Sequence, residues 1–294
     1  ATTVDGHTIE VCANLGNTAH TPDAVERGAD GVGLLRTEFI FMAHPEAPDL
    51  ATQVTEYQNA FDALDGLPLV ARTLDVGGDK PLDYWPLPQE DNPFLGMRGI
   101  RLSLTRPDIL ETQVRALLTA AGDRPLRIMF PMVKDLEEFR AARAIVTKVQ
   151  SEVSASNVQV GVMIEVPSCA LLASTLAPEV DFFSIGTNDL TQTALGLSRD
   201  DMGLFYDEYQ SKEIYNKNPF ASLDQNGVGK LIDFAVDRGR ATKPDLKLGI
   251  CGEHAGDPAS IDFCHRAGLD YVSCSPPRVP IARLAAAQAK LRNA

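Results

Sequence analysis

Short runs of β-branched and other apolar residues recur along the chain, and a longer amphipathic stretch follows each run. Each run ends in a polar segment that carries Gly or Pro, a pattern that predicts repeated units of one strand and one helix. The predicted strands cover residues 9–15, 31–35, 67–74, 126–132, 158–166, 180–185, 246–250 and 271–274. Helices are predicted at residues 22–28, 51–64, 107–121, 136–153, 229–239, 258–267 and 281–291.

Eight strand-and-helix units within 294 residues predict an α/β fold, a closed TIM-type (β/α)8 barrel of parallel strands. An open doubly wound sheet is the alternative. No linker or low-complexity segment divides the chain, so we expect a single domain over residues 1–294. Two long connections, 75–105 and 190–227, leave the ends of predicted strands. Barrels build their active sites from loops at that C-terminal face.

The acidic balance of the chain argues against a nucleic acid or an anionic membrane as its main partner. The 27 Lys and Arg residues stand against 40 Asp and Glu residues, which gives a net charge of -13. An anionic ligand therefore requires a local basic cluster. No apolar run has the length of a membrane span, and the first residues lack a signal-peptide pattern. The five scattered cysteines contain no Cys-x-x-Cys pair, which disfavours a disulfide framework and favours the cytoplasm.

Residues capable of chemistry gather directly after the predicted strands. Since parallel strands of a barrel end at one mouth, these residues are expected to form a single constellation. Its members include Arg36-Thr37-Glu38, Arg72 to Asp75, Phe130-Pro131-Met132, Glu165, Thr187-Asn188-Asp189, Cys251-Gly252-Glu253-His254 and Ser273-Cys274-Ser275.

Basic residues are concentrated around this predicted mouth. Arg36 and Arg72 follow apolar runs, and the long loop after the third run carries Lys80, Arg98 and Arg101. Guanidinium groups match the oxygens of carboxylates and phosphates, so the cluster predicts a site for a small polyanion. The alternative is that each arginine closes a structural salt bridge. The carboxylates available for such bridges are Glu38, Asp75 and Asp79.

Two carboxylates follow neighbouring predicted strands, Glu165 after GVMI and Asp189 after FFSIG. Such a pair, with room for water and substrate oxygens, is a typical site for Mg²⁺ or Mn²⁺. The alternative is that the two carboxylates only cap the following helices.

Cys251 ends the seventh predicted strand, where its thiol could give a proton to carbon or act as a nucleophile. A buried core cysteine is the alternative, and His254 could equally be a base or a structural hydrogen-bonding group. Neither Gly31-Val-Gly33 nor Gly77-Gly78-Asp79-Lys80 has the spacing of a nucleotide-binding loop.

These motifs resemble, in order, those of the C-terminal phosphoenolpyruvate (PEP)-binding barrel of the PEP-utilising enzymes. The matching stretches are GVGLLRTEFIF, RTLDVGGDK, NPFLGMRGIRL, IMFPMV, GVMIEVPS, DFFSIGTNDLTQ and CGEHAGDP. Residues 1–192 resemble Enzyme I of the PEP:sugar phosphotransferase system. Residues 193–294 resemble pyruvate phosphate dikinase, in GLSRDD, NPFASLDQNGVG, LKLGICGEH and GLDYVSCSPPRVPIARLAAAQA. This mixture raises the hypothesis of an engineered chimera or a reconstructed ancestor.

The resemblance implies a role for each of these residues in binding PEP and in forming pyruvate. The residues implied to bind PEP are Arg36, Arg72 and Arg199 at its phosphate and carboxylate, Lys80 and Arg98 on the phosphate side, and Asn188 at the carboxylate. Glu165 and Asp189 are implied to hold Mg²⁺, with Mn²⁺ as a possible substitute, and Cys251 to protonate the pyruvate enolate.

The resemblance also implies partners. In the family a histidine on a separate swivelling domain accepts the phosphoryl group, and no histidine of this chain lies in such a Gly-rich motif. The nucleotide-binding domain of the dikinase and the helical phosphocarrier-binding domain of Enzyme I are also absent from the sequence. We therefore expect a PEP-binding domain that is incomplete alone and forms a homodimer. A Mg²⁺-dependent pyruvate-enolate aldolase or lyase and a non-catalytic dimerisation module are the alternatives.

Overall fold

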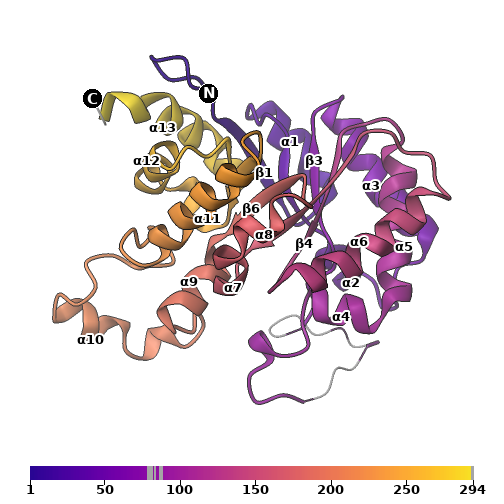
Figure 1. Ribbon diagram of the computed structural model, residues 1–294, viewed down its shortest axis with the longest axis horizontal. Helices are drawn as coiled ribbons and strands as arrows, with labels where there is room; N and C mark the ends of the chain where they lie inside the picture. Colours follow the sequence, from indigo (N-terminus) through magenta and orange to yellow (C-terminus); the bar gives the residue numbers. More distant parts are fainter. Residues whose placement is uncertain (78–81, 83, 86–88, 293–294) are drawn as a thin grey trace.

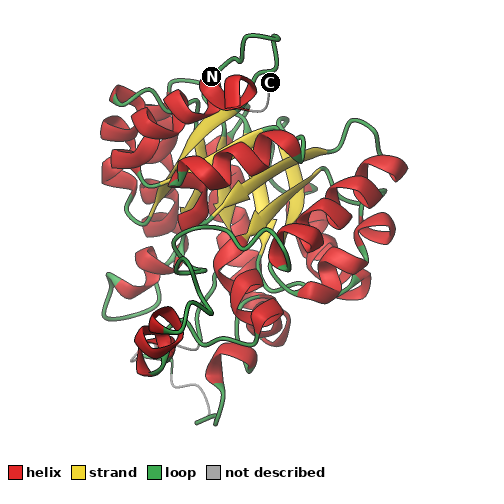
Figure 2. Cartoon of the chain, turned by 90° about the vertical axis from the view of Figure 1, so that its left-hand side faces the viewer, coloured by secondary structure: helices red, strands yellow, loops and turns green. Residues whose placement is uncertain are grey.

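A computed structural model describes the chain except for residues 78–81, 83, 86–88, 293 and 294. Its strands form a closed, all-parallel barrel in which each strand pairs with the next and the eighth pairs with the first. Helices surround this barrel (Figure 2). The strands are β1 Glu10–Leu15, β2 Val32–Arg36, β3 Leu69–Arg72, β4 Leu126–Phe130, β5 Val158–Ile164, β6 Phe182–Gly186, β7 Lys247–Cys251 and β8 Tyr271–Cys274. The predicted TIM-type barrel is confirmed, and the open sheet is wrong.

The predicted helices are all present, with ends shifted by a few residues. They are α1 Thr21–Glu26, α3 Leu50–Leu64, α5 Pro107–Ala121, α6 Leu136–Gln150, α11 Val228–Thr242, α12 Pro258–Arg266 and α13 Val279–Arg292. Shorter helices lie in segments that the sequence pattern left without helices, namely α2 Glu38–Met42, α4 Ile100–Thr105, α7 Pro167–Leu171, α8 Ala173–Leu176, α9 Thr187–Leu195 and α10 Tyr206–Ser211. The long connection 190–227 is therefore partly helical.

The helix α6 illustrates how the sequence sets these elements. The Asp135 side chain caps its first turn by accepting a hydrogen bond from the Glu138 backbone N–H at 3.1 Å. Phe139 and Val146 recur on one face and are buried, whereas Arg140, next to Phe139 in the sequence, is turned away from that face and is exposed. Lys148 in the last turn complements the helix dipole.

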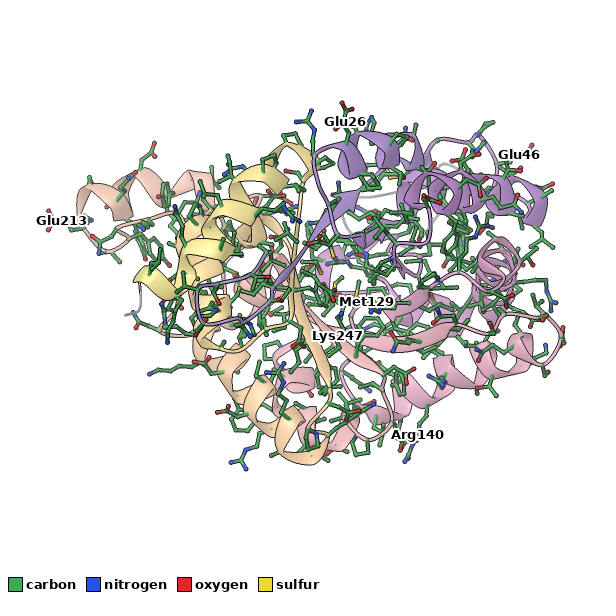
Figure 3. The ribbon with its side chains drawn as sticks, turned by 90° about the horizontal axis from the view of Figure 1, so that it is seen from above. Glu26, Glu46, Met129, Arg140, Glu213 and Lys247 are labelled. Atoms are coloured by element: carbon green, nitrogen blue, oxygen red, sulfur yellow. The ribbon has the colours of Figure 1, made fainter. Side chains whose placement is uncertain are left out.

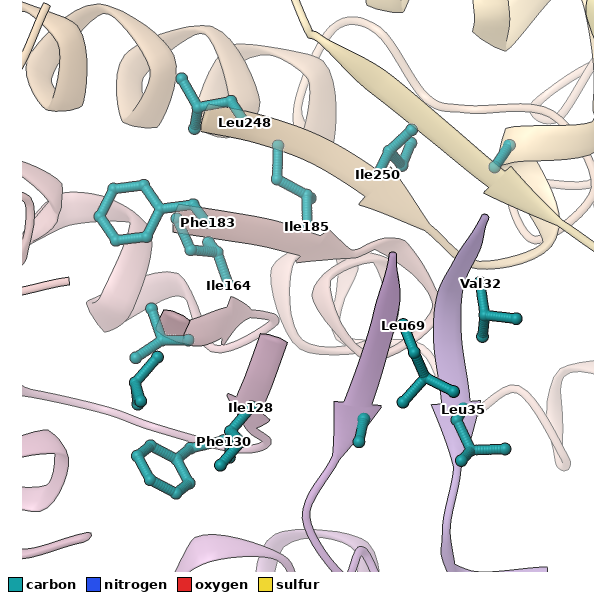
Figure 4. Packing of buried hydrophobic residues seen from close by; sticks show 14 of the residues in the cluster. Val32, Leu35, Leu69, Ile128, Phe130, Ile164, Phe183, Ile185, Leu248 and Ile250 are labelled. Atoms are coloured by element: carbon teal, nitrogen blue, oxygen red, sulfur yellow. The ribbon is translucent and has the colours of Figure 1, made fainter. Parts of the chain in front are cut away.

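Side chains alternate between two cores along each strand. Outward-facing residues such as Ile128 and Phe130 pack beneath the helices (Figure 4). Inward-facing residues form a separate cluster that fills the barrel, and Figure 3 places Met129 of this cluster near the centre of the molecule. The members of this inner cluster are Leu34, Val70, Met129, Met163, Phe182 and Cys251. The barrel interior is therefore a packed floor beneath the C-terminal mouth.

Two regions stand out from the barrel. The segment around α10 projects at the lower left of Figure 1, and the N-terminal segment and α13 lie at the upper left. Lys290 of α13 pairs there with Asp5, at 3.5 Å between nitrogen and oxygen. Within the described residues, no helix combines the length and the apolar character that crossing a bilayer requires.

Candidate active site

A cavity of about 1100 Å³ opens at the C-terminal ends of the strands. Its lining includes every described residue to which the family resemblance assigns a role: Arg36, Arg72, Arg98, Glu165, Asn188, Asp189, Arg199 and Cys251. The predicted Lys80 lies outside the described residues. The barrel therefore brings together residues that are more than 200 positions apart in the sequence.

Arg72 and Arg98 link the buried carboxylates of the mouth. Arg72 lies 2.6 Å from Glu38 and 2.9 Å from Asp75, measured between nitrogen and oxygen. Arg98 contacts Asp75 at 3.0 Å through Nε and Asp189 at 2.8 Å through Nη1. Both arginines are almost fully buried. The salt-bridge alternative thus holds for these two arginines, and their fixed guanidinium groups still line the cavity.

Arg36 is different, because it makes no ion pair within the described part of the chain. Its guanidinium lies 4.8 Å from the centre of the Phe39 ring, and its buried Nε has no hydrogen-bond partner there. Burial lowers the pKa of Arg36 despite the nearby Glu38 carboxylate, which acts in the opposite direction, so this cation lacks full compensation. An anionic ligand would supply that compensation.

Arg199 reaches the same cavity from the connection that follows α9. Its backbone N–H donates a hydrogen bond of 2.9 Å to Gln192 Oε1, and its side chain is exposed. Lys217 and Arg278 also line the cavity and were missed at the sequence level. Lys217 lies in an irregular segment, and Arg278 ends the short 3-10 helix Pro276–Arg278. Arg101 does not reach the cavity, because its guanidinium donates to the backbone carbonyls of Leu95 and Gly96.

Glu165 is a buried carboxylate in an environment of like charge. Its Oε1 accepts a hydrogen bond of 2.7 Å from the Met132 backbone N–H. Burial, followed by the charges of Asp189 and Asp75, raises the pKa of Glu165 to about 8. A Cβ atom at Gly186 would lie 2.8 Å from Glu165 Oε2, so this close approach requires glycine.

The carboxylates suit a hard cation. Burial is the largest cause of the raised pKa of Glu165, and repulsion by Asp189 is the next; a divalent ion would offset both. Among the described residues, no group of three or more His, Cys, Asp and Glu side chains forms a metal site. The donor set therefore fits an ion that takes two carboxylates and completes its shell with water and substrate, as Mg²⁺ does.

Cys251 lies at the floor of the mouth, fully buried. The Ser184 hydroxyl donates to its Sγ at 3.2 Å, and the thiol points to the Ile185 carbonyl at 3.7 Å. Burial raises the pKa of the Cys251 thiol to about 12. The group is thus a protonated thiol at neutral pH, suited to giving a proton rather than to acting as a resting nucleophile.

His254 has a structural role. Its Nε2 lies 2.8 Å from the Pro219 carbonyl, which can only accept, so Nε2 carries the proton. Its Nδ1 then accepts from the Thr187 hydroxyl at 2.7 Å. Burial lowers the pKa of His254, which keeps the ring neutral. The histidine therefore fastens the connection near Pro219 to the start of α9.

Asn188, in the first turn of α9, also lines the mouth. Its Oδ1 accepts a hydrogen bond of 3.3 Å from the Glu253 backbone N–H. The Asn188 amide is thereby positioned beside the loop that follows Cys251.

The family described as "PEP-utilising enzyme, PEP-binding domain" matches residues 1–291. The chain belongs to this family. Its similarity to pyruvate, phosphate dikinase of Clostridium symbiosum is 41% identity over 97% of this chain and 39% of the relative. The dikinase of Rhizobium meliloti (strain 1021) is 44% identical over 90% of this chain and 36% of the relative. The predicted membership of the PEP-utilising enzymes is confirmed.

A multiphosphoryl transfer protein of Rhodobacter capsulatus is 43% identical over 95% of this PEP-binding domain and 32% of that relative. The domain thus spans about a third of the length of the curated relatives it matches. Both kinds of relative align with nearly the whole chain, and the chimera remains a hypothesis.

One solved structure, Cryptosporidium parvum pyruvate kinase in complex with ADP, matches 97% of this chain and 68% of that chain. The TM-score is 0.59 at 12% sequence identity. At this identity the likeness concerns the fold alone.

Proposed function

We propose that the chain is the catalytic PEP- and pyruvate-binding domain of a phosphotransferase. It passes the phosphoryl group of PEP to a histidine on a separate domain and releases pyruvate. The observation that carries this proposal is the arrangement of one cavity, in which arginines and buried carboxylates surround a protonated thiol. Such a site suits a small polyanion that becomes an enolate.

The arginines bind the two charged ends of PEP. Arg36 and Arg72 take the phosphoryl group, with Lys80 and Arg98 on the same side, while Arg199 and Asn188 take the carboxylate. The buried Arg36 Nε, which has no hydrogen-bond partner among the described residues, supports this assignment, as does the rigid anchoring of Arg72 and Arg98. Fixed donors stabilise developing charge without reorganisation during the reaction.

Glu165 and Asp189 are the residues that would hold Mg²⁺, or Mn²⁺ in its place. When bound, the ion would favour the enolate by stabilising negative charge on its oxygen. Arg98 keeps the Asp189 carboxylate in place through two hydrogen bonds, at 2.8 and 3.1 Å. The Met132 backbone N–H does the same for Glu165.

Cys251 supplies the proton that completes the product. Transfer breaks the bond between phosphorus and the enol oxygen, whose electron pair stays with the pyruvate enolate. The enolate C3 then takes the Sγ proton of Cys251, and solvent returns a proton to the thiolate after release. The apolar floor around Cys251 supports this role because it keeps the thiol buried and protonated.

The domain works with partners in this proposal. It receives a phosphohistidine domain at the mouth, assembles as a homodimer and resides in the cytoplasm. The exposed apolar side chains on α13, Ile281, Leu284 and Leu291, support an association surface. All five cysteines are free and buried, as is usual in a reducing compartment.

Two variants test the division of roles. PEP is titrated calorimetrically with and without Mg²⁺, and exchange of the pyruvate methyl protons with D₂O is followed by NMR. Arg199→Ala should abolish PEP binding, because the carboxylate loses its charged partner. Cys251→Ala should leave binding nearly intact and stop the exchange, because only the proton-transfer group is lost.

The matched control is Arg140→Ala, which removes an arginine at the margin of the molecule (Figure 3) and should resemble wild type. Equal loss of PEP affinity in both site variants would contradict the division of roles. A folded wild-type protein that binds neither PEP nor Mg²⁺ would refute the function and support a non-catalytic dimerisation module. Aldol cleavage of a 4-hydroxy-2-keto acid without an added domain would support the lyase, although both nitrogens of His254, a candidate base, are engaged.

A further inference from the structure

The mouth contains an irregularity in strand pairing that the proposed function does not use. Ala13 of β1 pairs with Val32 of β2, but the next residue, Asn14, pairs with Leu34. The register thus skips Gly33. Irregularities of this kind redirect side chains and are frequent beside active sites. Here the side chain that reaches the mouth is that of Asn14, which lines the cavity.

A second observation fixes the direction of that side chain. The Ser273 hydroxyl on β8 donates a hydrogen bond of 2.6 Å to Asn14 Oδ1. A Cβ atom at Gly33 would lie only 2.4 Å from Ser273 Oγ. The skipped glycine therefore makes the space in which Ser273 holds the amide. No partner for Asn14 Nδ2 occurs among the described residues, which leaves this amide group with hydrogen-bond donors for a ligand.

The position of Asn14 in the ring of strands indicates which ligand group it would meet. β1 lies between β8 and β2, so Asn14 is next to the strand that ends in Arg36. It lies four strands from β5, which precedes the carboxylate Glu165. The Arg36 side chain approaches the β1 loop, because a Cβ atom at Gly16 would be 3.4 Å from its Nη2. Asn14 therefore shares the anion-binding side of the mouth with Arg36.

We propose that Asn14 is a phosphoryl-binding residue, with Ser273 as its positioning residue. The Asn14 amide donates to a phosphoryl oxygen of PEP beside Arg36 and makes no contact with the pyruvate carboxylate. The two residues thereby contribute to selecting PEP over pyruvate. This inference rests on the proposed function, since it names a further contact in the same substrate site.

The experiment compares two ligands. PEP and pyruvate are each titrated in Mg²⁺ into wild type, Asn14→Ala, Asn14→Asp and Ser273→Ala, with the fold checked by circular dichroism. Asn14→Ala should weaken PEP binding about tenfold to a hundredfold, the range expected for a hydrogen bond to a charged group. Pyruvate binding should stay within about twofold of wild type. Asn14→Asp should weaken PEP binding further, because a carboxylate would face the phosphoryl group.

Ser273→Ala should weaken PEP binding by less than Asn14→Ala does and should also leave pyruvate binding within about twofold of wild type, because the amide loses only its orientation. Because Ser273→Ala removes only one oxygen atom, it should fold, and it therefore still tests the proposal if the Asn14 variants do not fold. Asn59→Ala, at an exposed asparagine of α3, is the matched control and should bind as wild type does. Unchanged PEP binding in the site variants, or equal loss of both ligands, would overturn the role of Asn14. A wild-type protein that binds neither ligand would instead refute the proposed function.

Discussion

Single residues of the mouth carry charges that would be costly to bury alone. Arg72 and Arg98 are 5% and 4% exposed, and Asp75, which contacts both, is completely buried. Removing one member of such a group leaves an uncompensated buried charge, which costs about 3–5 kcal/mol. Glu165 is also buried, with the carboxylates of Asp189 and Asp75 nearby. The buried ion pairs therefore keep the charged groups of the site in fixed positions, and burying these charges lowers the stability of the fold.

Glu165 predicts a pH dependence of the metal-free protein. Its pKa is raised from 4.5 to about 8 in the folded state, so the folded protein binds this proton more tightly than the unfolded chain. The resulting stability is complete below about pH 4.5 and is lost as the pH rises to about 8. Glu165→Gln keeps an oxygen that accepts from Met132 and removes the charge. Between about pH 4.5 and 8, the unfolding free energy of this variant should therefore fall less steeply than that of wild type. The two falls should differ by a few kcal/mol in total.

Urea denaturation in EDTA at pH 5 to 9 measures this difference. Glu26→Gln, at an exposed carboxylate in Figure 3, is the control and should follow wild type. Parallel stability curves for wild type and Glu165→Gln would show that the repulsion at Glu165 does not bear on folding.

At the scale of elements, a buried glutamine on α5 joins the ends of two strands. Gln113 Oε1 accepts from the Leu74 backbone N–H at 2.9 Å, and its Nε2 donates to the Thr37 hydroxyl at 2.9 Å. The Thr37 hydroxyl donates in turn to the Arg72 carbonyl at 2.7 Å. One side chain thus fixes the segments that present Arg36 and Arg72 to the mouth.

Gln113→Leu should destabilise the protein by about 2–4 kcal/mol, because the Leu74 N–H and the Thr37 hydroxyl lose a buried partner. PEP affinity should fall as well, since Arg72 loses part of its support. Thermal unfolding and calorimetry measure the two effects. Gln58→Leu, at an exposed glutamine of α3, should change stability by less than about 0.5 kcal/mol. A Gln113→Leu protein with wild-type stability and affinity would contradict this role.

At the scale of the whole molecule, one barrel contains both parts of the chain, residues 1–192 and 193–294, which resemble different relatives. α9 extends across the boundary between them, and the pairs β6–β7 and β8–β1 join the two parts of the chain. Arg98 from one part and Cys251 from the other line one cavity. The surface also bears exposed apolar residues on α13, including Leu284 at 59% exposure.

The proposed homodimer makes Leu284 a sensitive position. Leu284→Asp should shift the protein from dimer to monomer in sedimentation velocity at micromolar concentration, because a carboxylate is costly to bury in an apolar contact. Leu171→Asp, at a leucine of α7 with 55% exposure, should leave the dimer unchanged. A monomeric wild-type protein would refute the homodimer, and a dimeric Leu284→Asp protein would place the contact on another surface.

The sequence predicted the eight strands and the longer helices because their apolar periodicity is strong and local. The apolar pattern did not predict the helix α9, because its sequence TNDLTQTAL is short and rich in polar residues. Several of these residues line the mouth. Local pattern is weakest where residues are chosen for chemistry rather than for packing.

The candidate residues of the site followed from one rule, that parallel strands end at a common mouth, together with the family motifs. The sequence by itself determined that Arg36, Arg72, Glu165, Asp189 and Cys251 would meet there, since strand order around a closed barrel follows the chain. It did not reveal Lys217 and Arg278, which also line the cavity. Only the tertiary structure decided that Arg98 pairs with Asp189, that Arg101 turns to a loop, that His254 fastens a connection and that Ser273 orients Asn14. These outcomes depend on contacts between residues distant in sequence and on burial, which set hydrogen-bond geometry and pKa and leave no local periodicity to detect.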